Sequence, residues 1–410
     1  MKKSCIITVL AASVFAIGAS GHAATIEDLQ KQLDNLNGKI QELQTQKVGE
    51  TTRENSGYMK KVWDKTTIGG YGELDYIFKR DNGNDNGGNT LNPHRVVLYV
   101  GSELADWVSL NTELEWENGG SDGQNGGVAV EQAYLDFKLN EMFNIKAGVM
   151  LMPMGAYNQA HEPTNFYSTA RPALDTFLIP STWQEMGIGA HGTLGRKVDY
   201  QLMAVAGLDG TKFDAENGIR EGRQAFGKDS NRNFAVTGRL DYHPITNLST
   251  AVSFYSGNSA PSGTATAYTT VMAFDGKYRY SDFEIAGEYV HVYQDKPELL
   301  NPEIGRNMSG YWVEGAWHCM PKMLKNGKLA NADSILFARY SELTTQDGGA
   351  IDSTKTSGRF DRNYTTVGLS FMPIPAVAIK ADYQFFGDHR AAGEIPLDND
   401  KFQLTVGFVF

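Results

Sequence analysis

The chain has 410 residues, a net charge of −11 and 44 glycines, and 21% of its residues are charged. Average glycine usage is about 7%, so the excess predicts many turns and much β-structure. The acidity argues against a nucleic-acid partner. After the N-terminal segment no apolar run approaches the roughly 18 residues of a membrane-spanning helix, which excludes a helical membrane protein.

Residues 1–24, MKKSCIITVLAASVFAIGASGHAA, predict a secretory signal peptide. Lys2 and Lys3 precede an apolar run, and small residues surround a cleavage point after Ala23 or Ala24. An uncleaved anchor is the alternative, but the run is short of the about 20 residues that span a bilayer. After cleavage Cys319 stands alone, so the mature chain contains no intramolecular disulfide.

Residues 25–47 predict a short coiled coil, because the apolar side chains alternate at spacings of three and four. They are Ile26, Leu29, Leu33, Leu36, Ile40 and Leu43. The alternative is an amphipathic helix that lies on its own domain, but polar residues fill most of the other positions. About three heptads are marginal alone, so we expect the coil to assemble in a trimer or dimer that the rest of the chain holds together. Residues 48–66 read as a polar linker.

From residue 67 to 410 the apolar pattern has a period of two, in segments of about ten residues, as in a transmembrane β-barrel. We predict an all-β fold, a 16-stranded antiparallel barrel. The predicted strands are 68–78, 94–104, 108–117, 128–139, 143–152, 185–194, 198–208, 234–243, 248–257, 268–280, 283–293, 308–319, 334–343, 363–372, 376–386 and 401–410. A soluble β-sandwich also has short, regular strands, but lipid admits only helices and closed barrels.

The connections between these strands alternate in length, as they do in outer-membrane barrels. Short turns such as 105–107 and 373–375 alternate with long loops such as 80–93 and 209–233, although the turn 320–333 is longer than this rule prefers. The short turns are predicted to be periplasmic, together with the coil and both ends of the barrel. A barrel of this size leaves an aqueous channel.

The inward parity of the strands carries charges that are predicted to line the channel. The basic candidates are Arg95, Lys138, Lys146, Arg239, Lys277, Arg279, Arg339 and Lys380. The acidic candidates are Glu73, Asp75, Glu103, Glu113, Glu115, Glu117, Asp136, Glu185, Asp199, Asp241, Asp275, Glu284, Glu288, Glu314 and Asp382. Acidic rings favour cations, but the narrowest ring decides selectivity. The alternative is that most of these charges pair across neighbouring strands.

The loop 153–184 is predicted to form the constriction, since loops of this length are usually functional. Its prolines and aromatic residues would let it pack against the inner wall. Its titratable members are His161, Glu162, Arg171 and Asp175. Adjacent residues such as His161 and Glu162 have no ligand geometry of their own, and no His or Cys spacing of a metal site occurs. We therefore predict no metal, no cofactor and no catalytic site.

Several stretches resemble the phosphate-selective porin O/P superfamily of outer-membrane porins. They are GGYGELDY, HRVVLYVGSELADWVSLNTELEWE, VEQAYLDFKL, AGVMLMPMGAYNQAHEPTNFY, IPSTWQEMGIGAHGTL and AVTGRLDY, which cover most of residues 68–243. The resemblance implies a trimeric 16-stranded porin with its third loop inside. Phosphate-specific members have a ladder of inward Arg and a constriction Lys, matched loosely here by Arg95, Lys146, Arg171, Arg239, Arg339 and Lys380. The acidic excess departs from that pattern.

The leading hypothesis is an outer-membrane porin for passive diffusion of small hydrophilic solutes, anions among them. Its expected partners are outer-membrane lipid, two further copies of the chain and the barrel assembly machinery. Phe410 ends the last strand and would be the assembly signal that the resemblance implies. The alternative is an envelope-spacing protein whose barrel anchors the coil. A barrel enzyme is a third hypothesis, for which no nucleophile and base are found.

Overall fold

The structure is a computed structural model that describes residues 30–31, 34–35, 39, 64–79, 89–120, 126–224, 233–261, 264–301, 304–347, 360–389 and 399–410. Residues 65–410 form one compact unit. The predicted signal peptide and most of the predicted coil and linker lie outside the described residues. The five described residues between 25 and 47 have helical backbone, and the coil stays a prediction. No helix among the described residues is long and apolar enough to cross a membrane.

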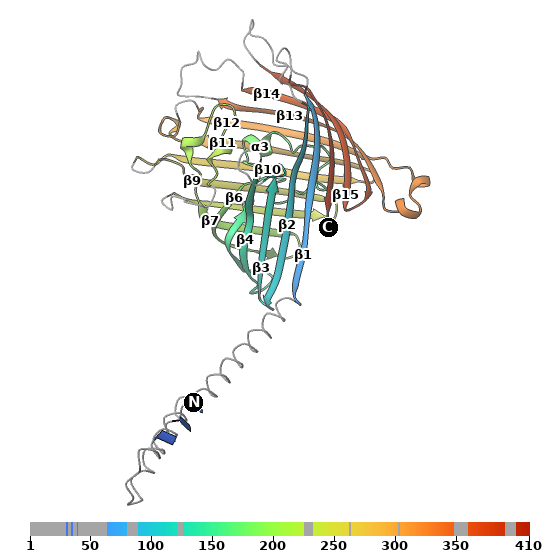
Figure 1. Cartoon of the computed structure of the whole chain (residues 1–410). Coiled ribbons are helices and arrows are strands. Elements are labelled where there is room, and N and C mark those ends of the chain that lie inside the picture. The colour runs from blue at the N-terminus through green and yellow to red at the C-terminus, as the bar shows by residue number, and fades with distance from the viewer. Residues whose placement is uncertain are drawn as a thin grey trace, which may run out of the picture. The chain divides into compact units, whose positions relative to one another are not determined.

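The described residues of this unit form a closed antiparallel barrel of sixteen strands (Figure 1). The strands are β1 (Thr66–Lys79), β2 (Thr90–Ala105), β3 (Val108–Glu117), β4 (Gly127–Phe137), β5 (Asn144–Leu151), β6 (Gln184–Leu194), β7 (Val198–Ala206), β8 (Phe234–Ile245), β9 (Leu248–Asn258), β10 (Tyr268–Tyr280), β11 (Phe283–Gln294), β12 (Asn307–His318), β13 (Asp333–Asp347), β14 (Asp361–Ile374), β15 (Val377–Asp388) and β16 (Lys401–Val409). The predicted fold class is confirmed. Every strand pairs with its neighbours in the chain, and β16 returns to β1.

The largest differences from the predicted strand bounds lie on the side of the long loops. β2 begins at Thr90 instead of residue 94, and β13 continues to Asp347 instead of residue 343. The prediction followed apolar alternation, which is required only where a strand faces hydrocarbon. Hydrogen-bonded pairing continues beyond that region without the pattern, so the sequence did not mark these ends.

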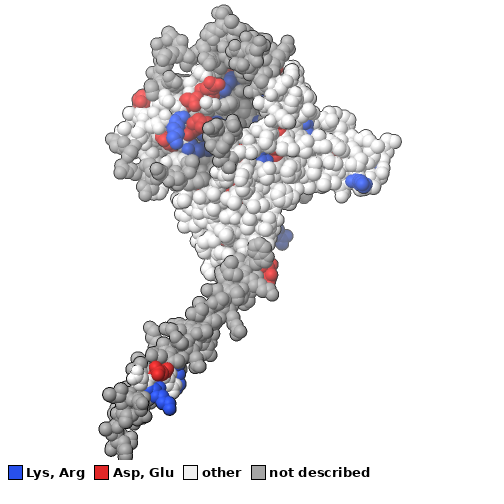
Figure 2. Space-filling view, viewed as in Figure 1, with Lys and Arg blue, Asp and Glu red and all other residues white. Residues whose placement is uncertain are grey.

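The two faces of the barrel wall differ as a lipid face and a lumen face must. On β16 the side chains of Phe402, Leu404 and Val406 are 38%, 40% and 41% exposed, while Gln403 and Thr405 between them are 3% and 2% exposed. The side of the barrel wall turned toward the viewer in Figure 2 is almost free of Lys, Arg, Asp and Glu. This apolar outer band is the face that a bilayer requires.

Pairing of the first and last strands removes the open edge of the sheet. Tyr71 lies opposite Val409, and Gly70 and Phe410 exchange backbone hydrogen bonds of 3.0 and 2.9 Å. A free strand edge in lipid would leave backbone groups unpaired, each at a cost of several kcal/mol. The C-terminal residue therefore takes part in closing the barrel.

Exposed aromatic side chains gather at the rim that carries the short turns. Trp107 lies in the turn between β2 and β3, and Phe283 stacks on Trp317 with ring centroids 6.1 Å apart. Aromatic girdles mark the level of the lipid headgroups in outer-membrane barrels. This rim is the periplasmic one in the general arrangement of such barrels.

The loop between β5 and β6, residues 152–183 and called L3 below, lies within the barrel. The structure describes all of these residues, and only Ala160 and Asn165 are exposed. L3 contains the one-turn helix α3 (Leu174–Phe177), which contacts β12 and β13. In Figure 1 α3 is drawn among the strands of the far wall.

L3 shares an apolar core with inward side chains of the wall and with three other loops. Its own members are Met152, Met154, Leu174, Leu178, Ile179 and Trp183, and the remaining members come from β5, β7–β13 and the loops after β7, β9 and β11. Examples from the wall are Val205, Tyr255, Val271, Val290 and Trp312, and examples from the loops are Phe213, Ile219, Leu300 and Ile304. Many inward positions of this part of the wall are therefore apolar and pack against L3, while the charged cavity described below lies on the opposite side.

Candidate functional site

A charged cavity of about 760 Å³ lies between L3 and the wall formed by β16 and β1–β4. Asp75, His94, Glu117 and Gln403 come from the strands, and Arg171 and Thr182 come from L3. The segment after β7 adds Lys212, Arg220, Glu221 and Arg223. Figure 2 shows acidic and basic side chains gathered in a hollow at one mouth of the barrel. Charged and polar side chains thus line this cavity from the strands, from L3 and from the segment after β7.

The signs of charge around this cavity are nearly balanced. Six Lys or Arg side chains (Arg95, Arg171, Lys212, Arg220, Arg223 and Lys401) face five carboxylates (Glu73, Asp75, Glu115, Glu117 and Glu221), with His94 beside Asp75. The acidic excess of the predicted lumen as a whole does not extend to this cavity. A weak field of either sign is what a channel of low selectivity requires.

Basic side chains of the wall hold L3 in place through its backbone carbonyls. Arg95 donates to His161 O at 2.9 Å and Arg239 to Gly155 O at 2.8 Å. Arg339 donates to Ala170 O at 3.2 Å and Lys380 to Ser168 O at 2.9 Å. Four members of the predicted basic ladder therefore serve as loop anchors, and among them only Arg95 also borders the cavity.

Two glycines permit the close approach of L3 to the wall. A Cβ on Gly407 of β16 would lie 2.5 Å from Cβ of Pro163. Gly155 has φ +65°, which disfavours other residues, and a Cβ there would overlap Ile179 and the Glu288 carboxylate. L3 consequently lies against the backbone at both positions.

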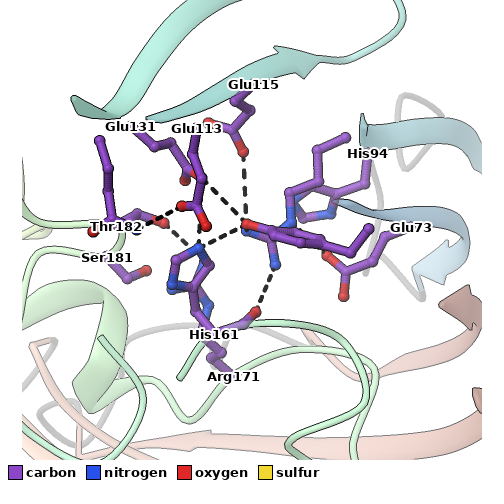
Figure 3. Close-up of polar contacts among 12 residues, drawn as sticks. Glu73, His94, Glu113, Glu115, Glu131, His161, Arg171, Ser181 and Thr182 are labelled. Carbon is purple, nitrogen blue, oxygen red and sulfur yellow. Dashed lines mark hydrogen bonds and ion pairs between the residues drawn. The ribbon is translucent and has the colours of Figure 1, made fainter. Parts of the chain in front are cut away.

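Near one end of the cavity, Arg95 joins L3 to the wall in a dense polar cluster (Figure 3). Arg95 is 2% exposed and lies 2.8 Å from Glu73 Oε2 and 3.9 Å from Glu115 Oε1. The Tyr71 hydroxyl lies 2.7 Å from His161 Nε2 and 3.2 Å from Glu131 Oε2. In Figure 3 Glu113 and Glu131 reach from the wall toward His161.

Glu131 is the functional candidate that strand alternation missed. Counting by twos from the predicted inward Asp136 places Glu131 on the lipid face. The structure has a bulge there: Glu113 pairs with Gln132 and Leu114 pairs with Val130, which leaves Glu131 unpaired and directed inward with no exposed surface. Two signals in the sequence could have revealed it. A carboxylate stands at a position that alternation assigns to lipid, and the apolar residues change from even positions at Val130 to odd positions at Leu135.

The predicted site residues fall into four groups. Arg95, Glu115 and Arg171 border the cavity. Glu113 and His161 meet behind it in the Arg95 cluster. Arg239, Arg339 and Lys380 contact L3 from the other walls, and Asp175 lies within L3 in α3. Lys146 lies over the Tyr134 ring, and Glu162 accepts from Asn165 within L3.

Two opposite charges of L3 are buried without complete pairing. Burial lowers the pKa of Arg171 to about 10, so its guanidinium remains charged at neutral pH. Its Nη2 donates to Thr182 Oγ1 at 3.4 Å, and its Nη1 has no hydrogen-bond partner among the described residues. Burial raises the pKa of Asp175 to about 6, against the opposing effect of Arg171.

Three solved outer-membrane proteins share the fold at low sequence identity. DcaP, an outer-membrane channel of Acinetobacter baumannii, is 13% identical with a TM-score of 0.57 over 84% of this chain and 97% of that one. An anion-selective porin from Comamonas acidovorans is 11% identical with a TM-score of 0.54 over 84% and 99%. OprB of Pseudomonas putida is 9% identical with a TM-score of 0.54 over 87% and 97%. These likenesses show the fold alone.

A protein of Aquifex aeolicus (strain VF5), described as an uncharacterized protein, is 29% identical over 363 residues, 84% of this chain and 80% of that protein. The family model described as "Putative beta-barrel porin-2, OmpL-like" matches residues 76–410. The predicted resemblance is confirmed as far as the outer-membrane porin class, and the phosphate-selective O/P superfamily stays a prediction. By this match over most of its length, the chain belongs to the OmpL-like beta-barrel porin-2 family.

Proposed function

We propose that this porin forms a water-filled channel for the passive diffusion of small hydrophilic solutes, anions among them. The observation that carries the proposal is the charged cavity beside L3, on the side of the lumen opposite the apolar core. Solutes would pass along β16 and β1–β4, where charged side chains replace part of their hydration. No catalytic step is needed for this task.

The charges that face the cavity support the passage of anions. Arg171 carries an unsatisfied donor, and Lys212 and Arg220 lie at the more exposed end with partly exposed side chains. Carboxylates alternate with these groups, so a solute meets both signs along its path. This pattern favours weak selectivity over a single-ion filter.

We further propose that the channel works as a homotrimer. Barrels of this size and fold include a protein of Vibrio cholerae whose solved structure is described as a trimer form. The exposed apolar face of the barrel provides surface for both lipid and neighbouring subunits.

Reconstitution of the purified protein into planar bilayers tests the channel proposal. We expect stepwise conductance that grows with salt concentration, and a small reversal potential under a salt gradient. Arg220→Gln should move the reversal potential toward cation selectivity and Glu117→Gln toward anion selectivity, because each removes one charge from the cavity. Arg196→Gln, at the turn between β6 and β7, is the matched control and should leave it unchanged. Absence of stepwise conductance at every salt concentration would show that the protein is not a channel.

A further inference from the structure

The buried end of the Arg95 cluster holds an imidazole and two carboxylates with the composition of a metal site. One ligand atom each from Glu113, Glu131 and His161 can be chosen so that all three lie within 4.8 Å of one another. His161 Nε2 and Glu131 Oε2 are 3.6 Å apart. Around a tetrahedral ion with bonds of about 2.1 Å, neighbouring ligand atoms lie about 3.4 Å apart. The pair needs almost no adjustment, and Glu113 needs a small rotation inward.

The orientation of His161 suits a ligand. Its Nδ1 lies 3.0 Å from the Asn158 carbonyl oxygen, which can only accept. In the neutral ring the proton is then on Nδ1 and the lone pair is on Nε2, directed at the carboxylates. A backbone carbonyl that fixes the second nitrogen in this way is a regular feature of metal-binding histidines.

Glu131 supplies the second, independent observation. Its side chain is completely buried, and Oε1 has no hydrogen-bond partner among the described residues, while Oε2 accepts from Tyr71. A buried carboxylate oxygen without a partner is costly. The bulge therefore turns inward a carboxylate whose Oε2 lies 3.6 Å from His161 Nε2 and whose Oε1 is buried without a partner among the described residues.

The charges of the cluster leave room for a cation. Arg95 is held by Glu73 at 2.8 Å and by Glu115 at 3.9 Å. Glu113 accepts from the neutral amide of Gln132 at 2.7 Å, and Glu131 lies in contact with His161, while Arg95 and Arg171 act on it from farther away. In the part of the chain that the structure describes, neither Glu113 nor Glu131 forms a direct ion pair with a Lys or Arg.

We propose that Glu113, Glu131 and His161 bind a divalent transition-metal ion that joins L3 to the β3–β4 wall. Zn²⁺ is the reference ion, because imidazole suits transition metals whereas Mg²⁺ and Ca²⁺ prefer all-oxygen sites. The ion takes the Nε2 lone pair, and the Tyr71 hydroxyl, 2.7 Å from Nε2, lies close enough to complete the coordination shell. The bound ion would thus link His161 of L3 to Glu113 of β3 and Glu131 of β4.

The test measures Zn²⁺ binding to the folded, detergent-purified full chain after treatment with EDTA. Isothermal titration should give one tight site per chain, and Mg²⁺ should not compete. His161→Ala and the isosteric Glu131→Gln should each lower the Zn²⁺ affinity by about 100-fold or more, since loss of an outer-shell partner alone costs about 10- to 100-fold. Zn²⁺ should also raise the unfolding temperature of the unmodified protein and leave that of both variants unchanged.

Two matched controls separate this site from other surface binding. Glu162→Gln changes the carboxylate beside His161 in the chain, which accepts from Asn165 instead. His191→Ala removes an imidazole that lies 2.9 Å from a single carboxylate, Asp136. Both should bind Zn²⁺ like the unmodified protein. Absence of a tight site, or equal affinity in Glu131→Gln and the unmodified protein, would overturn the proposal, with His161 then serving only as a hydrogen-bonding partner. Since the readout is binding, it is independent of whether the barrel conducts.

Discussion

Arg339 shows how a single buried charge supports the loop inside the barrel. It lies on the inner face of β13 with 2% of its surface exposed, and Nη1 lies 2.6 Å from Ser168 Oγ and 3.4 Å from Glu314 Oε2. Removal of one partner of a buried ion pair leaves an uncompensated charge and typically costs about 3–5 kcal/mol. Much of that energy would be lost from the docking of L3, since Ser168 and Ala170 belong to the loop.

We therefore predict that Arg339→Met loosens L3 without opening the barrel. Chymotrypsin should then cut the folded variant at Phe166 or Tyr167, which the docked loop protects because both side chains pack inside. The double variant Arg339→Met/Glu314→Gln should recover much of the protection, because no carboxylate is left without a partner. Arg279→Met, a change at an exposed residue of β10, is the control. If Arg339→Met resists cleavage as well as the unmodified protein, Arg339 does not anchor the loop.

At the scale of the element, L3 holds a carboxyl pair that links its docking to pH. Asp175 of α3 and Glu288 of β11 are buried carboxyl groups that act on each other, and neither Asp175 oxygen has a hydrogen-bond partner among the described residues. Arg171 of L3, Arg339 of β13 and Asp275 of β10 are the other charges that act on Asp175. Burial raises the pKa of Asp175 to about 6 in the docked loop, compared with 3.8 for a solvated Asp.

Because the docked loop holds this proton more tightly than the undocked loop, docking is strongest below pH about 4 and weakens as the pH rises through about 6. The rise in the pKa of Asp175 from 3.8 to about 6 corresponds to about 3 kcal/mol of docking free energy. Asp175→Asn should remove the part of this dependence that Asp175 carries and protect L3 better at pH 8, since the neutral amide places no charge in the buried loop. Hydrogen exchange of residues 166–178, corrected for the intrinsic effect of pH, measures it. Glu162→Gln should keep the dependence, and a variant Asp175→Asn that still loosens between pH 5 and 8 would assign it to another group.

The elements also show where sequence reasoning reached its limit. The hydrocarbon of the bilayer requires apolar side chains at every second position of a strand. The sixteen strands and the closure of β16 on β1 were therefore predictable from residues such as Phe402 and Leu404. Inward positions carry no such requirement. Met203 and Val205 face inward yet contact L3 and other apolar residues, and only tertiary packing decides this. The bulge at Glu131 reverses parity within one strand, which strict alternation cannot represent.

At the scale of the whole molecule, the two sides of the lumen have different tasks. The side of β7–β13 packs L3 and three other loops in an apolar core, and the side of β16 and β1–β4 borders the charged cavity. The basic residues that a phosphate ladder would need, Arg239, Arg339 and Lys380, are engaged by L3. This division explains how a barrel with an excess of acidic residues can have nearly equal numbers of positive and negative side chains around its cavity.

Assembly of the whole barrel depends on the strand that closes it. Phe410 follows β16, exchanges backbone hydrogen bonds with Gly70 and stacks its ring on Phe408 at 6.4 Å. Deletion of Phe410 removes both hydrogen bonds and the terminal aromatic ring, while the cavity, on other residues of β16, is untouched.

We predict that the variant yields less assembled trimer in outer membranes, measured by native electrophoresis against total protein. The channels that do assemble should have unaltered single-channel conductance. Phe402→Leu, at the opposite end of the same lipid face, should assemble normally. A normal trimer yield with altered conductance would place the role of Phe410 in the pore instead of in assembly.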